Sequence, residues 1–279
     1  MTSRPPGNAA TTPRTGLGIR GLPLEVDHVT RSFGGHRAVD DVSFRVGAGT
    51  ITGLIGPNGA GKTTLFNVIA GALSPSAGRV VLGDRRLDGQ PAHRVLRAGV
   101  ARTFQIPRPF AALTVLENVM LAGRAQLGER FWANWLRAGA VAAGERALRE
   151  RAQELIEFVG LSALAGSPGR VLSGGQRKLL ELARALMTEP RVLLLDEPVA
   201  GVNPALLEVI AERVLALHRA GLTVFLIEHN LDLVMRLCSP ILVMASGRLL
   251  VEGNPETVRS DRRVIDAYLG RPGPSPADQ

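Results

Sequence analysis

The stretch GPNGAGKTT, residues 56 to 64, has the residue types and spacing of a phosphate-binding loop. It fits G-x-x-x-x-G-K-[ST], in which glycines let backbone N–H groups turn inward around an anion at a helix N-terminus. Lys62 is one of only two lysines among 33 basic residues, and its compact ammonium suits a tight phosphate pocket. We expect it to reach the β- and γ-phosphates of a nucleotide, and we expect the Thr63 hydroxyl to bind Mg²⁺. The predicted binding loop comprises Gly56, Pro57, Asn58, Gly59, Ala60, Gly61, Lys62, Thr63 and Thr64.

An acidic pair, Asp196 and Glu197, ends the apolar run RVLLLDEP. Adjacent side chains at a strand end point in different directions, so the two carboxylates can take different roles. We expect Asp196 to hold Mg²⁺, directly or through water, and Glu197 to polarise the water that attacks the γ-phosphate. The predicted reaction is therefore hydrolysis of a nucleoside triphosphate.

Two further polar residues have side chains suited to the same site. His229 ends the run LTVFLIEHN, and its imidazole can hydrogen-bond both phosphate and water. Gln105, within RTFQIPRPF, carries an amide that can contact Mg²⁺ or water while its loop moves, although a solvated loop glutamine is the ordinary expectation. The predicted catalytic set is Glu197, His229 and Lys62, and the predicted metal set is Thr63, Gln105 and Asp196.

The stretch LSGGQRKLLELARALM, residues 172 to 187, predicts a helix that starts near Gly174 and ends before Pro190. Two glycines in its first turn cost about 1 kcal/mol each relative to alanine. A helix N-terminus attracts anions, and glycine lets a phosphate approach the backbone closely. Since the phosphate loop already serves one triphosphate, we expect this end to cap the γ-phosphate held by a second chain, arranged head to tail. The capping residues would be Ser173, Gly174, Gly175 and Gln176.

Three apolar runs must position these groups. None of them alternates polar with apolar residues, so we expect strands buried on both faces of a parallel sheet. Ligands bind such sheets at the carboxyl ends of the strands, where the polar residues fall. Helical patterns follow at 63–72 and, capped by Asn203 and opened by Pro204, up to Gly221. The runs are ITGLIG (51–56), RVLLLDEP (191–198) and LTVFLIEHN (222–230).

The rest of the chain completes an α/β fold with a phosphate-loop core. LEVDHVTRSFGG and VDDVSFRVGAGT alternate polar with apolar residues and predict a small antiparallel β subdomain. Residues from about 111 to 189 predict a helical subdomain inserted between strands of the core. One domain is expected over residues 22–270, with a disordered extension at 1–21 and a disordered tail at 271–279.

Composition excludes several classes of protein. One cysteine, Cys238, permits no intramolecular disulfide and favours a reducing compartment. No apolar run reaches the roughly 18 residues that span a bilayer, and the N-terminus does not resemble a secretory signal. The net charge of +8 is spread along the chain and aromatic residues make up only 4%, which disfavours nucleic acid as a partner. A basic surface beside an anionic membrane leaflet accounts for the charge equally well.

The order of these motifs resembles that of the ATP-binding-cassette ATPases, over residues 22 to 270. LSGGQ between the phosphate loop and the acidic pair is close to diagnostic of that family. The resemblance implies ATP and Mg²⁺ as ligands and two chains closed around ATP, with the loop at Asn203 crossing the interface; hydrolysis would reopen them. It places Phe33 where the family has an adenine-stacking aromatic residue, and Asn203 where aspartate is more frequent. The motifs are, in order, GPNGAGKTT, Gln105, LSGGQ, VLLLDEP, AGVNP and His229.

Finer features resemble the branched-chain amino-acid importer subfamily, and within it the LivG type; related members serve urea and amides. The features are ARTFQIPRPFAALTVLENVMLAG, a long helical insert with Trp132 and Trp135, AGVNP with IEHN, and the ending VIDAYLG. Either tryptophan could help dock a membrane partner, but core packing is the ordinary role. The ATPase of lipopolysaccharide export shares AGV-P, HN and a YLG ending and is the alternative.

The resemblance predicts an ATP-hydrolysing, energy-coupling subunit at the cytoplasmic face of the inner membrane. Its expected partners are integral-membrane permease subunits, a second cassette ATPase (a copy or a paralogue) and, indirectly, a substrate-binding protein. The Gln105 loop and the helical subdomain would receive a permease helix. A soluble cassette ATPase of translation or DNA repair is disfavoured by the single cassette and the absence of a long heptad run. A P-loop GTPase or small-molecule kinase would leave LSGGQ unexplained.

Overall fold

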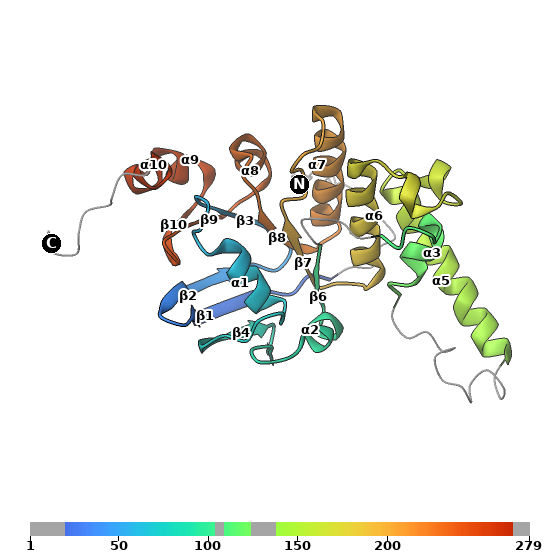
Figure 1. The fold of residues 1–279 in the computed structure, drawn as a ribbon, viewed down its shortest axis with the longest axis horizontal. Helices are drawn as coiled ribbons and strands as arrows, with labels where there is room; N and C mark the ends of the chain where they lie inside the picture. Colours follow the sequence, from blue (N-terminus) through green and yellow to red (C-terminus); the bar gives the residue numbers. More distant parts are fainter. Residues whose placement is uncertain (1–19, 104–108, 124–137, 270–279) are drawn as a thin grey trace, which may run out of the picture.

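A six-stranded sheet forms the centre of the structure, a computed structural model that describes residues 20–103, 109–123 and 138–269 (Figure 1). The strand order is β10-β9-β3-β8-β7-β6. Neighbouring strands are parallel except for β9 and β10, which are antiparallel. The mostly parallel sheet predicted from the sequence is therefore confirmed. The strands are β3 (Ile51–Ile55), β6 (Val100–Arg102), β7 (Val192–Asp196), β8 (Thr223–Ile227), β9 (Ile241–Ala245) and β10 (Arg248–Gly253).

The three predicted apolar runs become β3, β8 and β7, which are adjacent at the middle of the sheet. Both faces of these strands are buried, as the absence of alternation predicted. In β7, Leu193 and Leu195 belong to one hydrophobic core, while Val192 and Leu194 belong to the core on the opposite face. β6, β9 and β10 were not predicted: β6 is short and β10 is partly exposed, so both carry a weak local signal, whereas β9 is an apolar run like the other three and was overlooked.

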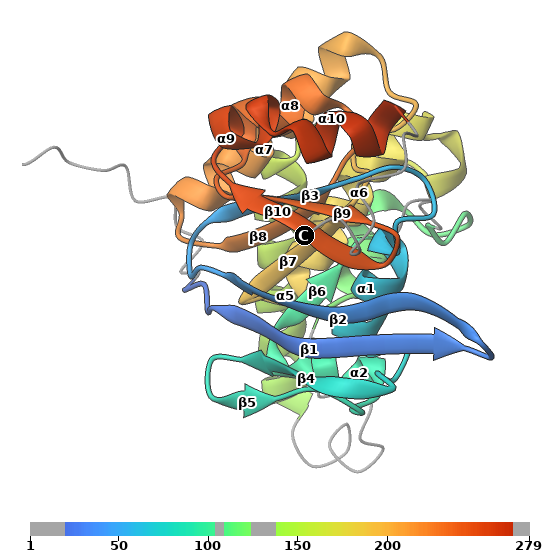
Figure 2. The same cartoon turned by 90° about the vertical axis from the view of Figure 1, so that its left-hand side faces the viewer.

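A four-stranded antiparallel sheet lies across one face of the larger sheet (Figure 2). Helix α1 (Lys62–Ile69) packs in the core between them, where the rings of Phe66 and Phe225 lie 4.9 Å apart. The predicted antiparallel subdomain is confirmed, and two later strands extend it. Its strands are β1 (Leu24–Phe33), β2 (His36–Val46), β4 (Ala77–Leu82) and β5 (Arg85–Arg86).

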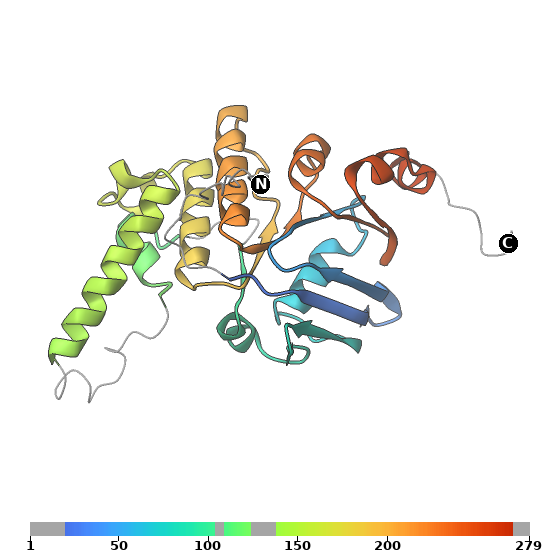
Figure 3. The same cartoon turned by 180° about the vertical axis from the view of Figure 1, so that it is seen from behind.

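Helices cover the other face of the larger sheet. Residues 111–189, where described, form helices and short 3-10 turns and contribute no strand to either sheet. The longest helix, α5, extends away from the sheets (Figures 1 and 3). The described helices besides α1 are α2 (Ala92–Ala98), α3 (Val115–Met120), α5 (Ala138–Phe158), α6 (Gly174–Met187), α7 (Pro204–Arg219), α8 (Leu231–Leu237), α9 (Pro255–Ser260) and α10 (Arg262–Leu269), with 3-10 turns η2 (Ser162–Leu164) and η3 (Gly169–Val171). None of them combines the length and apolar character needed to cross a bilayer.

Two element boundaries differ from the predictions. The helix predicted at 63–72 spans 62–69, because Gly71 has φ +72° and turns the chain out of the helix. The segment predicted as a disordered extension reached residue 21, yet Arg20 and Gly21 belong to the fold. The Gly21 N–H donates to the carbonyl oxygen of Gly221 at 2.9 Å, and Arg191 Nη1 donates to that of Arg20 at 3.0 Å. Residues 1–19 and 270–279 lie outside the described residues.

Cys238 provides a test of core packing. Its side chain is buried at the end of α8, and burial raises the pKa of the thiol from 9.0 to about 12. Since the thiolate is the reactive form, a shift of this size lowers its population at neutral pH by about 10³-fold. We expect the folded chain to resist iodoacetamide and the urea-unfolded chain to react with one equivalent, as measured by mass spectrometry. Modification of the folded chain at the unfolded rate would contradict this packing.

Candidate nucleotide-binding and hydrolysis site

The phosphate loop joins β3 to α1, between the strand and helix that the sequence predicted for it. Gly56 and Gly61 have φ of +150° and +96°, and a Cβ on either would lie 2.1 Å from a backbone oxygen. Gly59 has φ +78°, but a Cβ on this residue would meet nothing within 4 Å. The first two glycines are thus required by neighbouring backbone, whereas Gly59 is required only by its own conformation.

Lys62 is folded back onto this loop. Its ammonium donates to the carbonyl oxygens of Gly56 and Pro57, at 2.7 and 2.9 Å. Burial lowers the pKa of Lys62, and the nearby carboxylates of Glu197 and Asp196 partly oppose that shift. A cation held by neutral carbonyls beside two acids is ready to exchange those carbonyls for phosphate oxygens.

A cleft of about 400 Å³ lies over the loop, a volume within the range of small-molecule sites. It brings together residues from four separate parts of the sequence, including three that the sequence singled out: Phe33, Glu197 and His229. The Phe33 ring is 45% exposed, and the Arg31 guanidinium lies 4.7 Å from its centroid. The phosphate-loop residues on the cleft wall are Asn58, Gly59, Ala60, Gly61, Lys62, Thr63 and Thr64.

Asp196 lies behind the cleft wall at the end of β7, with 2% of its side chain exposed. Its Oδ2 accepts a hydrogen bond from Arg102 Nη2 at 2.6 Å, and Arg102 Nη1 also donates to Asn67 Oδ1. The other carboxylate oxygen, Oδ1, is buried and has no hydrogen-bond partner among the described residues. A buried acceptor without a partner is costly, so Oδ1 is suited to a cation or a bound water. Arg102 was missed because an arginine at a strand end is usually solvated.

Glu197 and His229 form a hydrogen-bonded pair, with Glu197 Oε1 and His229 Nε2 2.9 Å apart. The pair joins the ends of β7 and β8, which are neighbours in the sheet. Glu197 has φ +49°, a left-handed conformation that a non-glycine residue adopts at a cost of about 1–3 kcal/mol. Its N–H donates to the carbonyl oxygen of Ile227 at 2.9 Å, which helps to hold that turn. A carboxylate and an imidazole in contact can relay a proton.

Glu228, next to His229, is a buried carboxylate that was not predicted as a site residue. Its Oε1 accepts from the Val199 N–H at 2.9 Å, and its Oε2 accepts from the N–H groups of His229 and Asn230 at 3.0 and 3.4 Å. It therefore ties the loop after Glu197 to the start of the His229 loop. An acid ending an apolar strand, as in FLIEHN, is the signal that could have revealed it.

The start of α6, residues 173–175, is not among the described residues that line the cleft. Ser173 caps the helix as predicted: its Oγ accepts from the Gln176 N–H at 3.2 Å, and Gln176 Oε1 accepts from the Ser173 N–H at 2.9 Å. This capping box does not bond the N–H groups of Gly174 and Gly175. The helix itself cannot satisfy these two groups either, because they belong to its first turn.

The two glycines of this turn have different packing. A Cβ on Gly174 would meet nothing within 4 Å, so its own chain does not require glycine there. A Cβ on Gly175 would lie 1.7 Å from Leu206 Cδ2. Close approach of a phosphate was the reason expected for both glycines, but packing of α6 on α7 already accounts for Gly175. Gln105, Trp132 and Trp135 lie outside the described residues.

Comparison with known families identifies similar proteins. A profile described as ABC transporter matches residues 39–200, and one described as branched-chain amino acid ATP-binding cassette transporter matches residues 248–273. The chain is 38% identical over 251 residues to the probable branched-chain amino acid transport ATP-binding protein LivG of Archaeoglobus fulgidus, covering 88% of this chain and 95% of that protein. It is 40% identical over 248 residues to the high-affinity branched-chain amino acid transport ATP-binding protein BraF of Pseudomonas aeruginosa, covering 88% and 97%.

Solved structures share the fold. A crystal structure of a nucleotide-free ATP-binding cassette from an ABC transporter matches with a TM-score of 0.77 at 36% identity, covering 88% of this chain and 98% of that chain. A crystal structure of the ADP conformation of an ATP-binding cassette matches with a TM-score of 0.77 at 37% identity, covering 90% and 99%. The predicted fold class, a phosphate-loop core with a mostly parallel sheet, is confirmed by these likenesses.

Proposed function

The chain belongs to the ABC transporter family, and from this membership we propose that it drives a membrane importer of branched-chain amino acids. It is an ATPase, as the motif order predicted. The match of residues 248–273 to the branched-chain profile favours import over the lipopolysaccharide-export alternative. Its permease partners and its peripheral place at the cytoplasmic face of the inner membrane follow from the same proposal.

One observation carries the proposed chemistry: a single cleft is lined by the phosphate loop, Glu197 and His229. In it, Lys62 would exchange the carbonyls of its own loop for the β- and γ-phosphates of ATP. Glu197 would orient and deprotonate the attacking water, and His229 would hydrogen-bond Glu197 and the γ-phosphate. Phe33 would stack on the adenine from the exposed edge of the cleft.

Mg²⁺ fits the residues present. The partnerless Asp196 Oδ1 offers an oxygen, and the hydroxyl of Thr63 offers another at the start of α1. The described residues include no cluster of three His, Cys, Asp or Glu side chains. Mg²⁺ is commonly bound by few protein oxygens together with substrate phosphates and water. When bound, the ion would neutralise charge on the phosphates. Gln105 remains a predicted third contact.

The start of α6 would complete the site of a partner chain. Ser173 and Gly174 are exposed, and the residues that line the cleft of their own chain do not include them. Unsatisfied N–H groups at a helix N-terminus bind phosphate. Two chains arranged head to tail would therefore enclose two ATP molecules, each between a phosphate loop and a partner's Ser-Gly-Gly turn. The partner is either a second copy or a paralogous cassette.

Transport coupling is the test of this function. The chain should co-purify with its permease, and vesicles holding the complex and its binding protein should hydrolyse ATP faster when leucine, isoleucine or valine is supplied. If the partner cassette is a second copy, the same vesicles with a Lys62→Ala chain should show neither the basal nor the stimulated rate. Stimulation by urea or short amides alone would indicate that the chain serves one of the related importers of urea or amides. No permease association, with full ATPase activity, would refute the transport role.

A further inference from the structure

Lys178 is the second of the two lysines, and the proposed function gives it no role. It lies on α6, five residues after the Ser173 cap. Its ammonium donates a hydrogen bond of 2.8 Å to the backbone carbonyl oxygen of Glu197. The contact joins the helix that begins at Ser173 to the backbone of the proposed catalytic base, 19 residues later in the chain.

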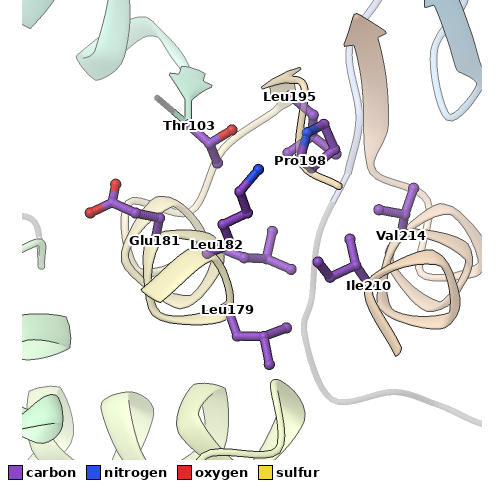
Figure 4. A pocket seen from close by; sticks show the side chains of 9 residues that line it. Thr103, Leu179, Glu181, Leu182, Leu195, Pro198, Ile210 and Val214 are labelled. Atoms are coloured by element: carbon purple, nitrogen blue, oxygen red, sulfur yellow. The ribbon is translucent and has the colours of Figure 1, made fainter. Parts of the chain in front are cut away.

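The stem of Lys178 crosses an apolar pocket between α6, β7 and α7. Figure 4 shows Leu182, Leu195 and Ile210 facing this space from those three elements. The pocket volume is only about 20 Å³, which is room for a single water molecule, so the pocket is not a ligand site. Packing therefore aims the ammonium at the end of β7. An arginine, the residue this chain uses at almost every other basic position, would present a wider planar group there.

The charges of two carboxylates act on the ammonium. Burial lowers the pKa of Lys178 below its ordinary value, and the negative charges of Glu228 and Glu197 only partly oppose that shift. Glu228 is 3% exposed and has its oxygens bound by the N–H groups of Val199, His229 and Asn230. The positive charge of Lys178 therefore acts on a buried acid that ties together the loops after β7 and β8.

The hydrogen bond from Lys178 also holds a residue whose backbone is strained. Glu197 is in the left-handed region, with φ +49°. Such a conformation persists only where its surroundings hold it. The Glu197 N–H is bound by Ile227, and its carbonyl accepts from Lys178 at 2.8 Å and from the Ala200 N–H at 3.2 Å. Ile227 ends β8 and Ala200 lies in the turn after β7, so of these three partners only the ammonium comes from a helix.

We propose that Lys178 is a positioning residue for ATP hydrolysis: it holds the Glu197 backbone so that the carboxylate meets His229 and the attacking water. This rests on the catalytic role of Glu197 proposed above. Lys178 is not among the described residues that line the cleft, and its hydrogen bond to Glu197 is made to the backbone carbonyl and not to the carboxylate. Its loss should therefore lower kcat and leave nucleotide binding unchanged.

The test compares Lys178→Met with the unaltered full chain. Methionine keeps an apolar stem in the pocket and removes the ammonium. Loss of a hydrogen bond to a charged group predicts a fall in kcat of about 10- to 100-fold, with the Kd for MgATP within about twofold of the original. Leu179→Ala is the matched packing control: it opens the same pocket and should lower Tm, while kcat of the folded protein stays near the original value.

Chemical rescue separates the ammonium from packing. Lys178→Cys treated with 2-bromoethylamine gains a side chain that ends in an ammonium at nearly the length of lysine. Cys238, the only native cysteine, is buried with a pKa of about 12 and should stay unmodified, as the treated original chain will show by mass spectrometry. We expect alkylation to restore most of kcat.

Three results would overturn the role of Lys178. They are kcat of Lys178→Met within twofold of the original, an equal loss in MgATP binding, and failure of alkylation to restore the rate. Glu197→Gln in the same assay tests the underlying premise. If Glu197→Gln hydrolyses ATP normally, the proposed catalytic base is wrong; if only Lys178→Met does so, the positioning role alone is wrong.

Discussion

Replacing Glu197 with glutamine should lower the rate of ATP hydrolysis by about 10²–10⁴-fold, the usual contribution of a general base. Glutamine is nearly isosteric and can still bond the His229 imidazole, which lies 2.9 Å from Glu197 Oε1, but it cannot accept a proton from water. The Kd for MgATP should change little, because Lys62 and the phosphate loop are intact. Steady-state ATPase assays with parallel equilibrium binding would measure both effects.

The same variant should accumulate as an ATP-bound dimer. Hydrolysis is the step that would reopen the pair, so a chain that binds but does not hydrolyse ATP remains closed. Gel filtration with light scattering at saturating ATP should show about twice the monomer mass. Glu212→Gln, an exposed glutamate on α7, is the matched control and should behave like the original chain. A Glu197→Gln chain that stays monomeric would count against the two-chain site.

Ser173→Arg should abolish hydrolysis in a different way. The long charged side chain would fill the space at the start of α6 where a partner's γ-phosphate is proposed to bind, and it would remove the capping bond to the Gln176 N–H. Loss of preorganised donors at a transferring phosphoryl group predicts a rate lower by at least about 10²-fold. Binding of ATP to the isolated chain should persist, since Ser173 is not among the residues lining that chain's cleft. Equilibrium binding and ATPase assays measure the two effects.

Mixing experiments decide whether Ser173 acts on its own chain or on the partner. Lys62→Ala disables the phosphate loop and Ser173→Arg disables the helix end, so each variant alone should be inactive. A mixed pair contains one intact site, made by the loop of the Ser173→Arg chain and the helix end of the Lys62→Ala chain. Recovered activity on mixing would support the shared site, whereas weakened ATP binding by Ser173→Arg monomers would place Ser173 in its own site.

The local chemistry of the site was readable from the sequence. A phosphate loop needs glycines, a lysine and a hydroxyl within one short stretch, so residues 56–64 can be identified from the sequence alone. The strand that ends in Asp196 and the strand that precedes His229 are buried on both faces, and such strands appear as uninterrupted apolar runs. The helix start at Ser173 depends on a cap and three following residues, and the structure places it where predicted.

Contacts between distant segments were not readable. The bond from Arg102 to Asp196 joins β6 to β7, and the bond from Lys178 to the Glu197 carbonyl joins α6 to the end of β7. No pattern of spacing in the chain indicates either one. Gly175 is a similar case, because a side chain at this position would collide with Leu206 on the next helix. The strands β6, β9 and β10 also depend on neighbours in the sheet for their register.

The sequence by itself determined which groups are proposed to bind ATP, because phosphate chemistry restricts the residue types within a few neighbouring positions. Only the tertiary structure decided how those groups are held: a left-handed turn at Glu197, fixed from β8 and from α6, and a carboxylate at Asp196 with one oxygen paired and one without a partner. The physical reason is that orientation and charge balance arise from packing between segments far apart in the chain, and a residue carries no local mark of the distant neighbours that will constrain it.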